Sequence, residues 1–399
     1  MSNRRGGAMR LVFVSNYFNH HQQPVSDRLF ELCENNGGSY TFIQTEPMEE
    51  ERLKMGWGEV FQNTSYLKNY WQEPEVCQQL IDEADAVIFG GTDEEGYIAS
   101  RLKAGRLIIR YSERLYKTGR YKFVSPRGLV KKFLDHTRYG LSKVYLLCSG
   151  AYVAGDFRLV LAYPFKKYKY GYFPACKKYD IDTLMEAKSS AQSGVVELLW
   201  AARMIDWKHP EVPIKLVRKL KESLILDQEI RYHLTMVGSG PLEEKMHRLA
   251  EELQVADLIS FVGSQNPEQV RKLMERADIY LATSDYGEGW GAVINEAMNS
   301  GCAVVANKAM GAVPYLIDDC KNGYWYKNKD VEMLAVRAGM LIMNEAVRKD
   351  IGIAAYKTIT EEWNGTIAAD RVFRLAEDLL AGRKPVVYET GPLSRCRLY

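Results

Sequence analysis

A glycine-rich turn between two glutamates is the part of the sequence best suited to chemistry. The run S-D-Y-G-E-G-W-G-A-V-I-N-E spans 284–296 and places Glu288 in the turn and Glu296 beyond it. A strand is expected to end at Ser284 and a helix to begin at about Ala292, so backbone N–H groups can approach a ligand there. A carboxylate accepts paired hydrogen bonds from neighbouring hydroxyls, which suits a ribose or a hexose. The alternative is an exposed pair of glutamates around an ordinary turn.

Short apolar runs alternating with helix-length segments must position this turn. Apolar strands without polar alternation indicate parallel sheets covered on both faces, which bind ligands at the carboxyl ends of their strands. The first series of expected strands is 10–15, 86–91, 106–110 and 144–149. The second series is 196–201, 233–238, 258–263, 279–284 and 303–306. Apolar residues at helical spacing predict helices over 243–253, 267–276, 331–343 and 366–381.

The small polar run K-S-S-A-Q-S-G over 188–194 separates the two series and predicts a linker. We therefore expect an α/β fold with two Rossmann-like domains, 1–187 and 195–365, that face each other across a cleft. A C-terminal helix and tail are expected over 366–399. The tail after Gly382 has no clear periodicity, so we expect a loose extension.

The composition is that of a globular protein and excludes several classes. Hydrophobic residues make up 46% and charged residues 26% of the 399 positions, with a formal charge of +2. There is no apolar run of 18 residues and no apolar segment of a secretory signal, so a cytoplasmic protein is expected. The 7 cysteines form no CxxC pair and favour reduced thiols over disulfides. Since no H-E-x-x-H run or carboxylate cluster has metal spacing, no metal site is expected.

The E-G-W-G-A-V-I-N-E-A-M run resembles the EX7E motif of retaining GT-B glycosyltransferases of family 4, the group 1 glycosyl transferases. Arg203 in A-R-M, followed by Lys208, resembles the G-R-L…K signature of that family. Further runs resemble the family in the same order, namely 236–241, 259–263, 311–317 and 322–323. Together these elements cover about residues 195–325, nearly the whole second domain. The resemblance implies a GT-B architecture and a nucleotide-sugar donor.

The resemblance also implies roles for individual residues. Arg203 and Lys208 match the pair that binds the donor diphosphate, and two cations suit that task without a metal. Glu288 matches the carboxylate near the transferred sugar, and Glu296 matches the one that binds the ribose. A surface salt bridge is the alternative for Arg203. The remaining expected donor-binding residues are Ser284, Gly289, Trp290, Gly291, Gly238 and Gly240.

Some positions depart from the family and leave the donor sugar open. Tyr315 stands where the family usually has Glu, Ala312 interrupts the preceding glycine pair, and Ala202 replaces the Gly before Arg203. The turn at 238–240 lacks the third Gly of G-x-G-x-x-G, which disfavours a dinucleotide-dependent dehydrogenase.

The first domain offers fewer candidates. Asn16, His20 and His21 follow the first expected strand, where they would contact the acceptor or a phosphate; a capped, exposed loop is the alternative. Many family members have a His after a later strand, and here the run 109–114 has none. Glu113 is our candidate for an acceptor-side base, with Ser112 and Arg114 as the other occupants of that spot.

Two basic stretches in the first domain are interleaved with aromatic residues. They are 114–134, with seven Lys and Arg and no acid, and 151–178. Cations with interfacial aromatics suit an anionic membrane or a phosphate-bearing lipid acceptor. No nucleic-acid-binding signature accompanies them, so no nucleic acid partner is expected. An ordinary solvated basic face is the alternative.

The predicted function is a retaining transfer of a hexosyl group from a UDP- or GDP-sugar to an acceptor hydroxyl, in polysaccharide or glycolipid biosynthesis. The acceptor is a saccharide or a lipid-linked saccharide, and no cofactor is required. The expected location is the cytoplasm, at the inner face of the plasma membrane. The alternatives are a nucleotide-sugar epimerase of the same fold and a non-catalytic protein that binds a sugar nucleotide or glycan.

Overall fold

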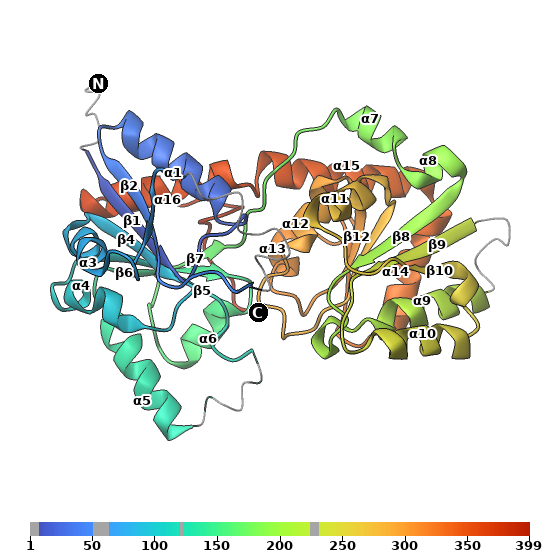
Figure 1. The fold of residues 1–399 in the computed structure, drawn as a ribbon, viewed down its shortest axis with the longest axis horizontal. Helices are drawn as coiled ribbons and strands as arrows, with labels where there is room; N and C mark the ends of the chain where they lie inside the picture. The colour runs from blue at the N-terminus through green and yellow to red at the C-terminus, as the bar shows by residue number, and fades with distance from the viewer. Residues whose placement is uncertain (1–7, 51–63, 118, 120–122, 124, 224–230) are drawn as a thin grey trace. The chain divides into compact units, whose positions relative to one another are not determined.

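The chain divides into two compact units in the computed structural model, which describes residues 8–50, 64–117, 119, 123, 125–223 and 231–399. Unit 1 comprises Met1–Ala175 and Trp363–Tyr399, and unit 2 comprises Cys176–Glu362. Each unit is a parallel sheet with helices on both faces (Figure 1). The α/β fold class predicted from the apolar strands is confirmed.

The sheet of unit 1 has the order β3-β2-β1-β4-β5-β6-β7. Its central strands are almost completely buried, and so their sequences are apolar without alternation. The strands are β1 (Arg10–Ser15), β2 (Ser39–Gln44), β3 (Leu67–Asn69), β4 (Ala86–Gly90), β5 (Leu107–Ser112), β6 (Val144–Ser149) and β7 (Lys167–Tyr170). The helices are α1 (Gln23–Asn35), α3 (Pro74–Glu83), α4 (Ala99–Lys103), α5 (Pro126–Asp135), α6 (Val153–Leu159) and α16 (Gly365–Leu380).

The C-terminal segment belongs to unit 1. Helix α16 lies alongside α1 (Figure 1), and an added Cβ on Gly365 would come within 2.7 Å of Pro24. The chain after α16 then returns to β7, where Leu393 N–H donates to the Lys169 carbonyl at 2.8 Å. Lys169 N–H donates in turn to the Ser394 carbonyl at 2.9 Å. The expected loose extension is therefore wrong, because main-chain hydrogen bonds hold the tail on the edge strand.

The sheet of unit 2 has the order β10-β9-β8-β11-β12-β13. Its strands are β8 (Val195–Ala201), β9 (Arg231–Val237), β10 (Ile259–Phe261), β11 (Ile279–Ala282), β12 (Ala303–Asn307) and β13 (Tyr324–Tyr326). Its helices are α7 (Ile181–Glu186), α8 (Ser189–Ser193), α9 (Glu211–Glu222), α10 (Glu243–Glu252), α11 (Pro267–Arg276), α12 (Val293–Asn299), α13 (Val313–Leu316), α14 (Val331–Met343) and α15 (Glu345–Glu361).

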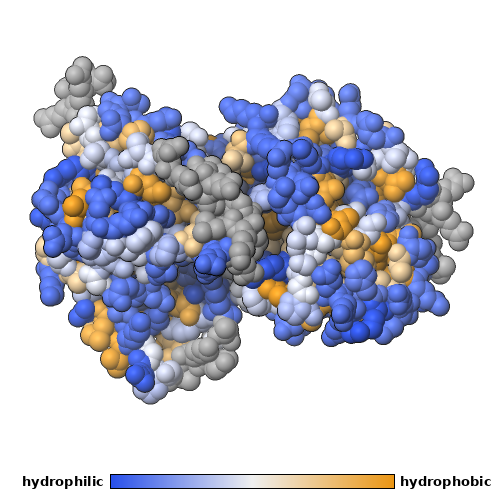
Figure 2. Space-filling model, viewed as in Figure 1, coloured by the Kyte–Doolittle hydropathy of each residue, from blue (hydrophilic) through white to orange (hydrophobic). Residues whose placement is uncertain are grey.

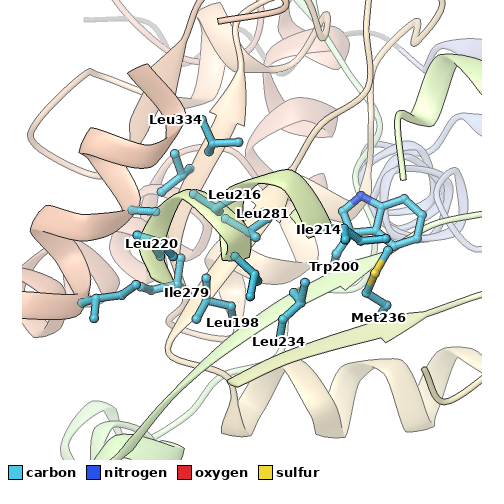
Figure 3. Packing of buried hydrophobic residues seen from close by; sticks show 14 of the residues in the cluster. Leu198, Trp200, Ile214, Leu216, Leu220, Leu234, Met236, Ile279, Leu281 and Leu334 are labelled. Atoms are coloured by element: carbon cyan, nitrogen blue, oxygen red, sulfur yellow. The ribbon is translucent and has the colours of Figure 1, made fainter. Parts of the chain in front are cut away.

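One core cluster of unit 2 lies between the sheet and helices that include α9 and α14 (Figure 3). Strands β8, β9 and β11 contribute Leu198, Trp200, Leu234, Met236, Ile279 and Leu281, while α9 and α14 contribute Ile214, Leu216, Leu220 and Leu334. All of these side chains are buried. Truncating one such leucine to alanine typically costs about 2–5 kcal/mol, so this packing fixes the strand ends that carry the candidate site.

The segment 188–194, expected as a linker, is part of unit 2. Its residues 189–193 form α8, and the Ser190 N–H donates to the buried Asp278 carboxylate at 3.1 Å. The Lys188 ammonium is buried and donates to three backbone carbonyls, those of Met274, Ala277 and Ser300, at 3.2, 2.9 and 2.6 Å. The first division of the chain therefore falls after Ala175, and the second falls before Trp363.

Candidate functional site

Two interlocked turns at the carboxyl ends of β8 and β9 present Arg203. Met204 N–H donates to the Ser239 carbonyl at 2.8 Å. Gly238 has φ +126°, and a Cβ there would lie 1.9 Å from the Ala202 carbonyl oxygen. A Cβ on Gly240 would lie 2.6 Å from the Met204 oxygen. Both glycines thus allow the two backbones to touch, which gives them a structural role beside the predicted donor contact.

The two predicted cations differ in their surroundings. Lys208 lies in a short 3-10 turn (Asp206–Lys208), and its ammonium is ion-paired with the Glu288 carboxylate. Each of these two side chains is 17% exposed. Arg203 is exposed, and its guanidinium lies 5.8 Å from the centre of the Trp207 ring. No carboxylate among the described residues pairs with Arg203, so its charge is available to a ligand.

The turn after β11 is held by hydrogen bonds to the segment that carries Lys208. Asp285 N–H donates to the Trp207 carbonyl at 3.0 Å, and the Thr283 hydroxyl donates to the Lys208 carbonyl at 2.6 Å. In the described parts of the chain, the N–H groups of Gly289 and Gly291 donate to no acceptor. The turn therefore presents main-chain donors beside the Lys208–Glu288 pair.

Trp290 and Ser284 lie behind this turn. The Trp290 ring is fully buried, and its Nε1 donates to the Asn295 side-chain oxygen at 2.9 Å. Ser284 is 5% exposed at the end of β11. The Trp290 ring therefore belongs to the core. Of Trp290, only the main chain can take part in the predicted contact.

The Glu296 carboxylate is an acceptor that no donor among the described residues occupies. It lies on α12, half-buried, and Arg271 donates to its backbone carbonyl at 2.9 Å. Its carboxylate forms no hydrogen bond or ion pair with the described residues. Burial raises the pKa of this carboxyl above the ordinary value of 4.5, and the nearby Arg271 partly opposes the shift. A desolvated carboxylate of this kind is suited to accept hydrogen bonds from ligand hydroxyls.

His209, which the sequence analysis missed, joins the two turns. Its Nδ1 lies 3.0 Å from Glu211 Oε1 and its Nε2 lies 3.1 Å from Asp285 Oδ2. The hydrogen bond with Glu211, helped by that with Asp285 against the effect of burial, raises the pKa of His209 above 6.5. Its φ of 50° lies in the left-handed region. The only sequence signal was its position next to Lys208.

Three of the four acceptor-side candidates lie near one another in unit 1. The Tyr172 hydroxyl and the Lys117 ammonium both donate to the Glu113 carboxylate. The His21 ring stacks on Tyr172 with ring centres 5.8 Å apart at an interplanar angle of 11°, and the His20 ring centre is 3.9 Å from that of His21. Burial raises the pKa of Tyr172 well above its ordinary value.

Asn16 has a different role. Its carbonyl accepts the N–H groups of Thr45 and Glu46 at 2.9 and 2.8 Å. These bonds join the carboxyl ends of β1 and β2, which places Asn16 in the scaffold of unit 1.

The second basic stretch is largely interior. Tyr163, Tyr168 and Tyr170 are buried, and the ammonium groups of Lys166 and Lys167 donate to the carbonyls of Ser142 and Tyr163. The expectation that the aromatics of 151–178 lie at an interface is therefore wrong for these three tyrosines. In the first stretch, residues 118, 120–122 and 124 lie outside the described residues.

Within the described ranges, no group of three His, Cys, Asp or Glu side chains could hold a metal ion. Within the same ranges, no helix is both long and apolar enough to cross a membrane. The charged groups described for the candidate site of unit 2 are those of Arg203, Lys208, Glu288, Glu296, and His209 with its partners Glu211 and Asp285.

Two parallel α/β units of this kind define the GT-B fold of glycosyltransferases. HepE of Anabaena, in a crystal structure with UDP, superposes on this chain with a TM-score of 0.67 at 15% identity, covering 94% of this chain and 100% of that chain. Residues 183–358 match the family described as "Glycosyl transferases group 1". The matched residues lie entirely within unit 2.

Two curated relatives match part of the chain. The putative colanic acid biosynthesis glycosyltransferase WcaL of Escherichia coli (strain K12) is 29% identical over 147 residues, which is 36% of this chain and 35% of WcaL. The amylovoran biosynthesis glycosyltransferase AmsK of Erwinia amylovora is 27% identical over 189 residues, 46% of this chain and 45% of AmsK. The chain thus matches less than half the length of these relatives.

Proposed function

We propose that the protein is a retaining glycosyltransferase that moves a hexosyl group from a nucleotide-sugar to an acceptor hydroxyl. The observation that carries this proposal is the Lys208–Glu288 ion pair, flanked by the exposed Arg203 and by the turn with unused N–H donors. A nucleotide-sugar needs cations for its diphosphate and oxygen acceptors for its hydroxyls. The site offers both at the carboxyl ends of one parallel sheet, where such sheets bind ligands.

The donor would be held by groups of opposite charge at its two ends. Arg203 and Lys208 would bind the diphosphate, and the N–H groups of Gly289 and Gly291 would donate to its oxygens. Glu296, whose carboxylate has no donor among the described residues, would accept from the ribose hydroxyls. Glu288 would lie at the transferred sugar, where its carboxylate is kept in place by Lys208.

In the proposed reaction, the bond between the anomeric carbon and the diphosphate oxygen breaks, and the acceptor oxygen attacks from the same face. The acceptor proton passes to an oxygen of the departing diphosphate, so the products are a glycoside and a nucleoside diphosphate. The Glu288 carboxylate, held in place by Lys208, would lie beside the positive charge that develops on the sugar. The two cations stabilise the leaving charge, the kind of interaction that commonly gives the largest single contribution.

The relatives support a setting in polysaccharide or glycolipid biosynthesis with a saccharide or lipid-linked acceptor. WcaL and AmsK carry names that refer to colanic acid and amylovoran biosynthesis. HepE is in complex with UDP, which favours a UDP-sugar over a GDP-sugar as the donor. Our proposed acceptor-binding surface is the cluster of Glu113, Tyr172 and His21 in unit 1. An aromatic ring can pack against a saccharide, and a carboxylate can accept hydrogen bonds from its hydroxyls.

The test is incubation of the purified protein with UDP- and GDP-sugars and a panel of saccharide acceptors. Acceptor-dependent release of nucleoside diphosphate, with a product whose anomeric configuration by NMR equals that of the donor, is expected. An inverted product would refute retention. Interconversion of two nucleotide-sugars without nucleotide release would indicate an epimerase, and binding without turnover would indicate a binding protein.

A further inference from the structure

Helix α5 in unit 1 exposes an apolar face. None of its ten residues is buried. Leu129, Val130, Phe133 and Leu134 are 37%, 59%, 53% and 43% exposed. Residues at i, i+1, i+4 and i+5 lie on one side of a helix, so these four form a single stripe. Figure 2 shows hydrophobic residues on the surface over this helix.

Two loops continue this apolar surface. Leu141 is 92% exposed, and Leu161 and Phe165 are 78% and 93% exposed. The loops lie side by side and are joined to the end of α5, since the Thr137 hydroxyl donates to the Val160 carbonyl at 2.6 Å and His136 lies 3.0 Å from the Tyr163 hydroxyl. We call Leu129, Val130, Phe133, Leu134, Leu141, Leu161 and Phe165 the α5 face.

The residues that surround the α5 face are strongly cationic. The segment 125–167 contains eight lysines and arginines but only two acids, Asp135 and Asp156. Asp156 is fully buried in an ion pair with Arg114, so it contributes no negative charge to the surface. On α5 itself, Arg127 and Lys131 border the apolar stripe on one side and Lys132 borders it on the other.

We propose that the α5 face docks on an anionic lipid bilayer, with its apolar side chains in the acyl boundary and its cations among the headgroups. An apolar stripe bordered by Lys and Arg is the pattern of interfacial helices, whose cations reach the headgroups while their stems stay apolar. Exposed apolar side chains gathered on one surface indicate an interaction site. The cationic border favours an anionic bilayer over an apolar protein surface, because each cation near an anionic surface adds about 1 kcal/mol of binding.

The α5 face comprises fewer residues than the two basic stretches that the sequence predicted as a membrane-binding surface. Tyr163, Tyr168 and Tyr170 are buried, so the inserting groups are the leucines and phenylalanines of the α5 face. The proposal does not depend on glycosyl transfer, since no residue of the α5 face belongs to the proposed donor or acceptor site.

The test is co-sedimentation of the full chain with vesicles of phosphatidylcholine alone and with phosphatidylglycerol added. Binding is expected only with phosphatidylglycerol, weakening as salt rises. Lys131→Gln with Lys132→Gln should weaken it about thirtyfold, the factor that corresponds to about 1 kcal/mol per lysine. Phe133→Ser and Phe165→Ser should each weaken it about tenfold even at low salt, because a phenylalanine leaves the acyl boundary.

Matched controls lie in unit 2. Lys245→Gln with Lys349→Gln removes two exposed lysines, and Val336→Ser removes an apolar side chain that is 62% exposed. Both controls should bind vesicles like the parent. Phe133→Trp keeps an apolar ring, and its difference fluorescence against the parent should shift to the blue when anionic vesicles are added.

Several outcomes would overturn the proposal. Parent-like vesicle binding by the Phe133 and Phe165 variants would show that the α5 face does not insert. Equal binding to neutral vesicles would show that the cations do not select the lipid. If the parent did not bind vesicles but formed a dimer that the same substitutions dissociate, the α5 face would be a contact between copies of this chain. As a control for folding, all variants should keep the thermal midpoint of the parent, so that a loss of vesicle binding cannot be due to unfolding.

Discussion

Replacing Lys208 by methionine separates its structural contribution from its proposed chemical one. Methionine is unbranched like lysine and only one heavy atom shorter, but it leaves Glu288 without its partner. Since each side chain is 17% exposed, the cost of that unpaired charge lies between the values for surface and buried pairs, at about 1–3 kcal/mol of unfolding free energy. The loss of a cation at the leaving diphosphate should lower kcat/KM by about 10²–10³-fold.

The double variant Lys208→Met/Glu288→Gln distinguishes the two contributions. It removes both charges, so much of the stability lost in Lys208→Met should return, with a coupling of about 1–2 kcal/mol. Turnover should not return, because the diphosphate still lacks its cation. Arg203→Met is the matched control, since this exposed cation pairs with no carboxylate in the described structure. It should lose activity at unchanged stability.

Urea unfolding and acceptor-dependent nucleotide release measure the two quantities on the same preparations. If Lys208→Met kept near-parental kcat/KM, the diphosphate would be held elsewhere. If the double variant recovered turnover along with stability, the pair would be purely structural and its place in the mechanism would be refuted.

Three further substitutions test the surroundings of this pair. Glu296→Gln should weaken nucleotide binding roughly 10–100-fold in calorimetry, through loss of a charge-assisted hydrogen bond. It should also raise the unfolding free energy at pH 7, because burial raises the pKa of Glu296 and its ionisation therefore destabilises the folded state as pH rises. Unchanged affinity for the nucleotide would contradict the assignment of Glu296 to the ribose. Because the pKa of His209 is raised in the folded state, the unfolding free energy that His209 contributes below pH 6.5 should decline as pH rises through the folded pKa. Urea titrations should show no such decline in His209→Gln, and the same pH dependence in both proteins would refute the role of the hydrogen bonds with Glu211 and Asp285. Gly238→Ala should lower stability by more than about 1 kcal/mol in thermal melts, whereas Gly263→Ala, with nothing within 4 Å of the new Cβ, should cost less; equal losses would refute the role of the close approach.

The sequence predicted the buried strands well and the edges of the sheets poorly. The strand expected over 10–15 has the bounds of β1, because five of its six residues are buried and apolar character marks burial on both faces. The strands β2 (SYTFIQ), β3 (LKN), β7 (KYKY) and β13 (YWY) were missed. Three of them, β3, β7 and β13, are edge strands, which need no continuous apolar run. The fourth, β2, lies inside its sheet but has the polar residues Ser39 and Thr41 at alternate positions.

The sequence supplies candidate residues for the site but not the contacts among them. A local motif located Glu288 and Glu296, and a second one located Arg203 and Lys208. The ion pair between Lys208 and Glu288 spans 80 positions, and no local pattern contains it. His209 was missed for the same reason, since its second carboxylate, Asp285, is 76 positions away.

Lysines show most clearly what only a three-dimensional structure supplies. Lys188 stands in a small polar run and is buried among three carbonyls, whereas Lys131 stands among apolar residues and is exposed. Composition alone therefore assigned the wrong environment to the first, and it could not distinguish Lys131 from Lys167, whose pKa is lowered by burial. A lysine that already donates to carbonyls has little charge to offer a lipid headgroup. The case for membrane docking thus depends on exposed cations beside exposed apolar side chains, and within 125–167 this combination falls on α5 and its adjoining loops.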